Sequence, residues 1–166
     1  MNPTHAFIGL GSNLDDPAEQ LLRAFSELSA QEGIVLLARS SLYRSAPVGF
    51  AAQPDFVNAA ALVATTLPPR RLLGVLHAIE AAHGRRREFM NGPRSLDLDL
   101  LLYGEEISAS AELVLPHPAA HLRAFVLEPL LELAPDCIIP GRGPARDCLA
   151  ALPERCLGVL ETVTIA

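Results

Sequence analysis

Two aspartates in an alternating run are the residues of this chain best suited to chemistry. Asp97 and Asp99 stand in the run Leu96-Asp97-Leu98-Asp99-Leu100. Alternation of apolar and polar residues predicts a strand, in which successive side chains point to opposite faces. Both carboxylates would then share one face, roughly 7 Å apart along the strand. Side chains placed in this way can reach a pair of divalent cations that lie about 3.5–4 Å apart.

The residues around the two aspartates favour a hard metal ion and a polyphosphate. Arg85, Arg86, Arg87 and Arg94 precede the pair, and a guanidinium group binds phosphate oxygens in a bidentate manner. Mg²⁺ is commonly held by one or two carboxylates together with the phosphates of a substrate. The alternative is a polar strand face that follows a solvated basic loop.

The run that follows the aspartates argues against this alternative. Residues 100–103 are apolar at every position, which predicts a central strand buried on both faces. Unpaired carboxylates on such a strand would be costly, whereas a bound metal ion would offset that cost.

Composition limits the class of protein. The chain has 166 residues, is 50% hydrophobic and 19% charged, and carries a net charge of −6. These values predict a single globular domain over residues 1–166 and no nucleic-acid partner. All 13 basic residues are arginine. The absence of lysine excludes a P-loop, a kinase of the protein type and Schiff-base chemistry.

The cysteines and the N-terminal sequence predict a cytoplasmic protein without a membrane partner. Three cysteines without metal-type spacing favour reduced thiols. The first residues have no basic region of the kind that begins a signal peptide. No apolar stretch is long enough to span a bilayer.

The hydrophobic pattern predicts an α+β fold. Strands are expected at 6–10, 34–43, 56–66 and 96–103, with a long loop at 45–55. A helix should begin at Asp16-Pro17, with Asp16 as its cap, and a second helix should run from Pro68 or Pro69 to Gly84. In the second strand, Val35 and Leu37 are expected to point inward, and Leu42 could be a third inward residue.

The order β-α-β-β-α-β is that of a ferredoxin-like core with a mainly antiparallel sheet. Beyond this core, the pattern predicts an edge strand at 112–116, a helix at 124–134, a short helix near 145 and a strand at 158–165. These elements would extend the core into an α/β sandwich.

Five short motifs resemble the 6-hydroxymethyl-7,8-dihydropterin pyrophosphokinase family of folate biosynthesis. They are Gly11-Ser12-Asn13-Leu14, Tyr43-Arg44, residues 53–60 (QPDFVNAA), residues 92–99 (GPRSLDLD), and Pro116-His117-Pro118 followed by Arg123-Ala124-Phe125. The resemblance implies transfer of pyrophosphate from ATP to the hydroxymethyl group of the reduced pterin, with release of AMP. It also implies a monomer that binds ATP, the pterin and two Mg²⁺ ions at Asp97 and Asp99.

The same resemblance assigns roles to individual residues. The catalytic residues it implies are Arg85, Arg94, Asp97 and Asp99. The pterin-binding residues are Ser45, Val48, Phe56, Asn58 and Phe125. The ATP-binding residues are His77, Glu80, Arg87, Arg94, Leu100, His117 and Arg123.

Simpler interpretations remain open for several of these residues. Asn58 could cap its own backbone, either phenylalanine could be ordinary core, His77 could be a surface histidine, and His117 could cap the helix that follows it. Gly11, Ser12 and Asn13 are expected to form a structural turn near the site.

Two other functions fit parts of the sequence. One is a Mg²⁺-dependent nucleotidyltransferase or phosphohydrolase, which also uses an Asp-x-Asp pair near a Gly-Ser turn. In nucleotidyltransferases, however, the turn lies close upstream of the pair, and here about eighty residues separate the two. The other is a non-catalytic pterin or nucleotide sensor on the same fold.

Overall fold

The computed structural model describes residues 2–47, 52–84 and 95–161. Its elements, in chain order, are β1 Thr4–Ser12, α1 Pro17–Ser29, β2 Ile34–Arg39, β3 Leu42–Ser45, β4 Phe56–Thr65, α2 Pro69–Ala82, β5 Asp97–Tyr103, β6 Ser108–Ala109, β7 Val114–Leu115, the 3₁₀ helix η1 Ala120–Leu122, α3 Ala124–Leu133, β8 Ile138–Ile139, β9 Gly143–Pro144, α4 Ala145–Ala150 and β10 Gly158–Glu161.

The main sheet has the strand order β10-β3-β4-β1-β5, and β2 also pairs with β4. Every strand pairing in the described ranges is antiparallel. When β2 and β3 are taken as one interrupted strand, the first hundred residues give the β-α-β-β-α-β order. The predicted ferredoxin-like α+β core is therefore confirmed.

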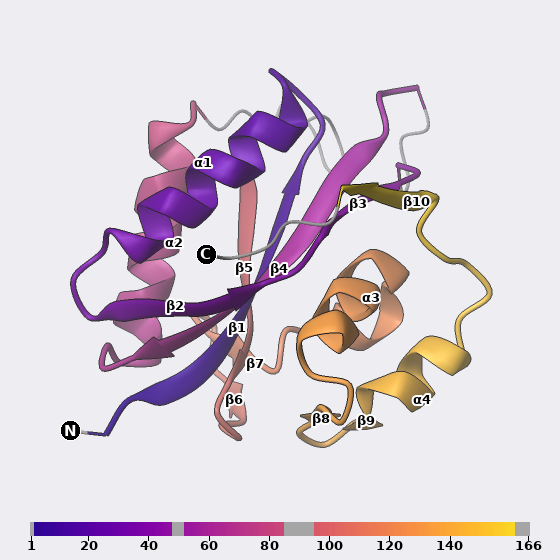
Figure 1. Ribbon diagram of the computed structural model, residues 1–166. Coiled ribbons are helices and arrows are strands. Elements are labelled where there is room, and N and C mark those ends of the chain that lie inside the picture. Colours follow the sequence, from indigo (N-terminus) through magenta and orange to yellow (C-terminus); the bar gives the residue numbers. More distant parts are fainter. Residues whose placement is uncertain (1, 48–51, 85–94, 162–166) are drawn as a thin grey trace.

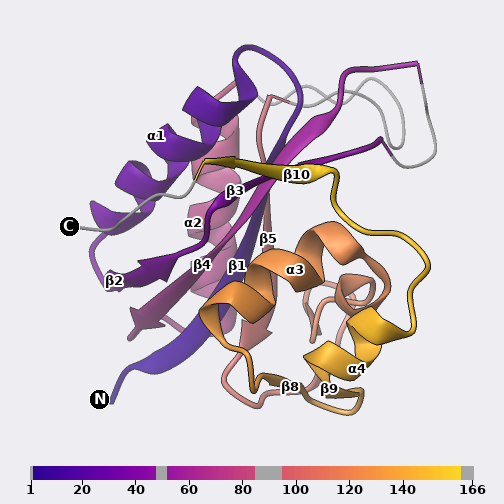
Figure 2. The same ribbon diagram turned by 45° about the vertical axis from the view of Figure 1, so that its right-hand side comes forward.

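Helices cover both faces of the sheet (Figures 1 and 2). The helices α1 and α2 lie on one face, and α3 and α4 lie on the other. Leu21, Leu28, Leu72 and Leu76 are fully buried on the first face, where they pack with the sheet in one apolar cluster. A second cluster joins Leu101 to α3 on the other face. No helix in the described ranges is both long and apolar enough to cross a membrane.

The predicted central position of the aspartate strand is wrong. β5 forms one end of the main sheet and pairs only with β1 among the described strands. It is nevertheless buried at Leu98, Leu100 and Leu101, because α2 covers one of its faces and α3 covers the other. A strand that is apolar on both faces therefore indicates that a layer of helices covers each face of the sheet. It does not distinguish an edge strand from a central one.

The predicted strand at 34–43 is divided into β2 and β3, and its predicted orientation is also wrong. Val35 is 60% exposed and Leu37 is 44% exposed, whereas Ile34 is buried; only Leu42 is buried as expected. The pairing of β2 with β4 shifts between Leu36 and Ala38, so the alternation changes phase within the strand.

The start of α1 differs in detail from the prediction. The helix begins at Pro17 as expected, but Asp16 has a left-handed backbone conformation (φ 63°) and makes no side-chain capping hydrogen bond. Its backbone carbonyl instead accepts a hydrogen bond from the Gln20 N–H at 3.0 Å.

The elements beyond β5 agree with the prediction, with two additions. Helices α3 and α4 and strand β10 lie where the pattern placed them, although residues 162–165 of the expected last strand are outside the described residues. The edge strand expected at 112–116 is the two-residue strand β7, which pairs with β6 in a separate hairpin. A second small hairpin, β8–β9, was not predicted.

Candidate active site

The register of the sheet places two groups of predicted site residues in one row. Gly11 on β1 lies opposite Asn58 of β4 on one side and opposite Asp97 of β5 on the other. Directly paired residues point to the same face of an antiparallel sheet. Asn58 and Asp97 therefore share the face that α3 covers, two strand spacings or roughly 10 Å apart.

The two aspartates also share this face. In β5, Asp97 and Asp99 are partly exposed and alternate with the buried Leu98 and Leu100. Each aspartate is paired with a glycine of β1: Asp97 with Gly11, and Asp99 with Gly9. The paired residues of β1 therefore place no side chain beside the carboxylates. The predicted alternation is confirmed at these positions.

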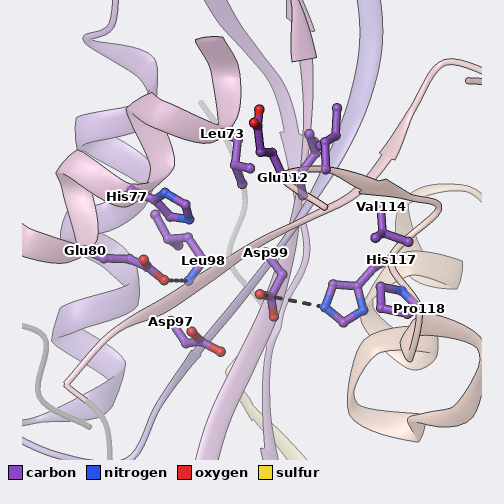
Figure 3. A pocket seen from close by; sticks show the side chains of 12 residues that line it. Leu73, His77, Glu80, Asp97, Leu98, Asp99, Glu112, Val114, His117 and Pro118 are labelled. Carbon is purple, nitrogen blue, oxygen red and sulfur yellow. Dashed lines mark hydrogen bonds and ion pairs between the residues drawn. The ribbon is translucent and has the colours of Figure 1, made fainter. Parts of the chain in front are cut away.

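A cavity of about 280 Å³ lies along the outer edge of β5, and both aspartates line it. A side chain and a backbone N–H from outside the sheet bind two backbone groups of β5 that a further strand would otherwise pair with. The Leu98 N–H donates to Glu80 Oε2 at 2.7 Å, and the His117 N–H donates to the Leu101 carbonyl oxygen at 3.0 Å. Figure 3 shows Glu80, Asp97, Asp99 and His117 around this cavity. The edge position of β5 thus creates the cavity.

His117 is held as a neutral imidazole with a defined tautomer. Its Nδ1 accepts a hydrogen bond from the Ala119 N–H at 3.1 Å, so the ring proton lies on Nε2. Nε2 is 3.9 Å from Asp99 Oδ1. Burial and, secondarily, the charge of Arg123 lower the pKa of His117 below its ordinary value, against a smaller effect of Asp97. His117 does not cap the helix that follows it, because η1 has no side-chain capping hydrogen bond. Its hydrogen bond to Ala119 uses Nδ1, so Nε2 still faces Asp99.

The residues predicted to bind the pterin lie on the same face as the aspartates. Asn58 is 5% exposed and Ser45 is 6% exposed, and Ser45 Oγ donates to Asn58 Oδ1 at 2.5 Å. Phe56 is paired with Ser45 in the register and is half-buried. An amide whose oxygen is engaged by a hydroxyl has a fixed orientation, with its N–H donors directed elsewhere.

Phe125, at the start of α3, is half-buried and packs against the second apolar cluster. The guanidinium carbon of Arg123 lies 5.6 Å from the centroid of its ring, within the range of a cation–π contact. Arg123 and Phe125 therefore form one unit.

The structure brings most of the predicted nucleotide residues together. His77, Glu80, Leu100 and His117 all line the cavity. His77 is exposed and Glu80 is 3% exposed. Val48, Arg85, Arg86, Arg87 and Arg94 lie outside the described residues, so their predicted roles stay predictions.

Six lining residues were not among the predicted site residues: Leu73 of α2, Leu98 of β5, Glu112, Leu113, Val114 and Pro118. Glu112 also pairs with Arg70, and both side chains are exposed. Leu73 belongs to the apolar period of α2, which suggested only a core position. No local signal links residues 112–114 to the lining residues of β5 and α2, which stand well before them in the chain.

The donor set of the cavity fits Mg²⁺. Among the described residues, no group of three or more His, Cys, Asp or Glu side chains is arranged to hold a metal ion. The two carboxylates of β5 supply hard oxygen ligands but would leave most coordination positions to water and to a bound phosphate. This division is the usual one for Mg²⁺, whereas Ca²⁺ and Zn²⁺ sites draw more ligands from the protein.

Comparisons with known proteins show the family of this chain. Residues 7–135 match the sequence model of the 7,8-dihydro-6-hydroxymethylpterin-pyrophosphokinase family. A 2-amino-4-hydroxy-6-hydroxymethyldihydropteridine pyrophosphokinase of Haemophilus influenzae is 47% identical over 135 residues, covering 81% of this chain and 84% of that protein. The protein of the same name in Methylorubrum extorquens is 47% identical over 149 residues, covering 90% of this chain and 94% of the relative.

Solved structures support the fold. A structure described as HPPK-DHPS in complex with substrates has a TM-score of 0.70 at 11% identity and covers 91% of this chain. Wild-type HPPK-DHPS of Plasmodium falciparum has a TM-score of 0.68 at 13% identity and covers 90%. This chain spans 43% and 45% of those two longer chains, respectively.

Proposed function

This chain belongs to the 7,8-dihydro-6-hydroxymethylpterin-pyrophosphokinase family, and we propose that Asp97 and Asp99 position Mg²⁺–ATP for its reaction. The chain is an enzyme that transfers pyrophosphate from ATP to the hydroxymethyl group of 6-hydroxymethyl-7,8-dihydropterin in folate biosynthesis. The observation that carries the proposal is the row Asn58–Gly11–Asp97, which joins a polar amide to the acidic pair across one strand.

Two Mg²⁺ ions are the proposed cofactor, with Asp97 and Asp99 as their protein ligands. The bound ions would offset the negative charge of the triphosphate. The shared face of the two carboxylates and their place on one cavity support this assignment. The residues opposite them on β1, Gly9 and Gly11, carry no side chains, so β1 adds no side chain between the carboxylates and a bound phosphate.

The nucleotide is proposed to occupy the cavity along β5. Leu73, Leu100 and Val114 supply apolar surface for a flat base, while His77 and Glu80 of α2 offer polar groups. The Nε2 proton of neutral His117 can be donated to a phosphate oxygen next to Asp99. Arg123 is proposed to add positive charge on the same side. Arg85, Arg87 and Arg94 are proposed to bind the phosphates of the nucleotide.

The pterin is proposed to bind over β4, with Asn58 reading its polar edge. Because the Ser45 hydroxyl donates a hydrogen bond to Asn58 Oδ1, the Asn58 amide can present its N–H donors in a fixed direction. Phe56 and Phe125 are proposed to stack on the two faces of the ring, as aromatic side chains do with flat heterocycles. Ser45 and Val48 would complete the pocket. This arrangement directs the hydroxymethyl group toward β5 and the phosphates.

The chemistry requires positioning and charge neutralisation more than covalent participation of the enzyme. Phosphoryl-type transfers are catalysed mainly by aligning the attacking oxygen with the phosphorus and by stabilising the charge that develops. The hydroxymethyl oxygen attacks the β-phosphorus, the bond from that phosphorus to the oxygen of the α-phosphate breaks, and AMP leaves.

Product analysis tests the reaction directly. The protein is incubated with ATP, Mg²⁺ and the hydroxymethyl pterin, and nucleotides are separated by chromatography. We expect AMP and the pterin diphosphate in equal amounts. Formation of ADP or inorganic phosphate would favour a phosphohydrolase, an adenylated product would favour a nucleotidyltransferase, and binding without turnover would favour a sensor.

The metal assignment is tested by Asp97→Asn, which keeps the size of the side chain and removes its charge. We expect the rate to fall by at least about 100-fold, because a ligand of the ions that neutralise the phosphates is weakened. Pterin affinity, measured by calorimetry without nucleotide, should change less than about threefold, because Asn58 lies across β1. The matched control is Asp136→Asn, an exposed aspartate that pairs with Arg146. Full activity of Asp97→Asn would contradict the assignment.

A further inference from the structure

The last residue of β1, Ser12, connects to the segment just before β5 through a buried pair of serines, Ser12 and Ser95. Ser12 Oγ donates to the Ser95 carbonyl oxygen at 2.5 Å, and Ser95 Oγ donates to the Gly84 carbonyl oxygen at 3.2 Å. Both serines are 0% exposed. Hydroxyl groups in such a position are retained only when their hydrogen bonds offset the cost of burial.

The three residues joined by these hydrogen bonds lie next to elements that carry residues of the proposed site. Gly84 follows α2, the helix that carries Glu80, and Ser95 stands two residues before Asp97. Ser12 follows Gly11, which is the partner of Asp97 in the sheet. The Ser95 hydroxyl therefore joins the end of α2 to the start of the aspartate strand, and the Ser12 hydroxyl joins that start to β1.

A second contact fixes the α2 side of this junction. His83, at the end of α2, has a side chain that is 0% exposed, and its Nδ1 contacts Gln20 Oε1 of α1 at 2.5 Å. The Gln20 amide N–H₂ in turn donates to the Asp15 carbonyl oxygen at 3.0 Å. The end of α2 is thus held to α1, so Gly84 offers Ser95 a fixed acceptor.

We propose that Ser95, with Ser12, is a positioning residue for the pyrophosphoryl transfer. It acts through Asp97: the two hydrogen bonds set where β5 begins, and so set the direction of the first metal-binding carboxylate relative to Glu80 and Gly11. The proposal rests on the function proposed above. Displacements of about 1 Å in a positioned group can cost 100-fold in rate, so a small shift of Asp97 is enough to be measured.

Ser95→Ala removes the hydrogen bond to Gly84 and leaves the backbone contact to Ser12. We expect kcat to fall about 10- to 100-fold, with the KM for the pterin changed by less than about threefold. The Mg²⁺ concentration that gives half of the maximal rate should rise, because Asp97 no longer meets the ions in its preferred direction. The dissociation constant of Mg²⁺, measured by calorimetry with a non-hydrolysable ATP analogue, should rise with it. Ser95→Thr, which keeps the hydroxyl, should restore most of the rate.

Ser40→Ala is the matched control. Ser40 is also 0% exposed; its hydroxyl donates to the Ser41 carbonyl oxygen at 2.8 Å and accepts from the Ala60 N–H at 2.8 Å. Its loss should lower the melting temperature as much as Ser95→Ala or more, but it should leave kcat and the Mg²⁺ requirement unchanged.

The outcomes separate this proposal from the function on which it rests. If the unaltered protein forms no AMP from ATP and the pterin, the proposed function fails. If it does, and Ser95→Ala behaves like Ser40→Ala in kcat and Mg²⁺ requirement, only the positioning role fails. Should Ser95→Ala not fold, Ser12→Ala decides in the same assays: a lower kcat with a raised Mg²⁺ requirement supports the proposal, and unchanged values overturn it.

Discussion

At the scale of single residues, the need for a glycine at position 11 comes from its neighbours in β4 and β5. A Cβ atom added at Gly11 would lie 3.1 Å from Asn58 Nδ2, closer than an ordinary van der Waals contact. Gly11 also lies opposite Asp97 in β5. The absence of a side chain therefore keeps the proposed pterin amide and the proposed metal ligand accessible across the same strand.

Gly11→Ala should consequently weaken pterin binding. We expect the KM for the pterin to rise about 5- to 20-fold, because the new methyl group displaces the Asn58 amide and lost hydrogen bonds of this kind cost about 1–2 kcal/mol. Steady-state kinetics with each substrate varied in turn will measure the change. Gly74→Ala on α2 is the control, since nothing lies within 4 Å of a Cβ there. An unchanged KM for the pterin would contradict the role given to Gly11.

Residues of the site differ in how far the sequence could predict them. Asp97 and Asp99 could be predicted because alternation is a local property that a strand converts directly into a shared face. The contacts of Ser95 could not, because its partners Ser12 and Gly84 stand 83 and 11 positions away. Glu112 gave no signal for the same reason, since only tertiary structure brings it to the cavity.

At the scale of elements, the interruption between β2 and β3 is fixed by helix α3. The Glu132 carboxylate accepts hydrogen bonds from the Ser41 N–H, the Ser41 hydroxyl and the Tyr43 hydroxyl. A side chain of α3 thus satisfies the backbone at the point where β3 begins. Apolar periodicity predicted a strand in this region, but it did not predict which side chains face the core. Residues 34–37 are all apolar, so either set of alternating side chains could face the core, and the prediction took the wrong set.

Replacing Glu132 should loosen this contact between α3 and the sheet. Glu132→Ala leaves the Ser41 N–H without its acceptor, and we expect a loss of about 1–2 kcal/mol in the free energy of unfolding. Glu132→Gln retains one acceptor oxygen and should lose less. Urea denaturation monitored by circular dichroism will measure both values. Equal stability of Glu132→Ala and the unaltered protein would show that water replaces the carboxylate at no cost.

At the scale of the whole molecule, the C-terminal third completes the site from the face opposite to α1 and α2. The segment after β7 contributes His117 to the cavity, and α2 approaches the same cavity from the other side with Glu80 (Figure 3). Helix α3 carries Phe125, which is proposed to stack on the pterin (Figure 1). The order of the first six elements could be predicted from periodicity. The edge position of β5 could not, because the order of elements along the chain leaves open which strands become neighbours in the sheet.

The stability of this arrangement should depend on pH in the alkaline range, because two acidic groups lie against the carboxylates of α3. Burial, followed by the hydrogen bond to Glu132, raises the pKa of the Tyr43 hydroxyl. Burial, followed by Glu128, raises the pKa of the Cys156 thiol from 9.0 to about 12. Both groups hold their protons more tightly in the folded protein than in the unfolded chain, so unfolding releases protons above about pH 9. The free energy of unfolding should therefore be constant with respect to these groups below that pH and should fall as the pH rises toward 12.

Tyr43→Phe and Cys156→Ala each remove one of these groups and should make the melting temperature decline less between pH 9 and pH 11 than it does in the unaltered protein. Differential scanning calorimetry over pH 7–11 will measure the slopes. Ser41→Ala is the matched control for Tyr43→Phe, because it removes another hydrogen bond to the same Glu132 carboxylate without removing a titrating group. It should lower the melting temperature by a similar amount at every pH. A decline that stays equally steep in both Tyr43→Phe and Cys156→Ala would show that other groups control alkaline unfolding, and that the contact of α3 with β3 and the C-terminal segment does not.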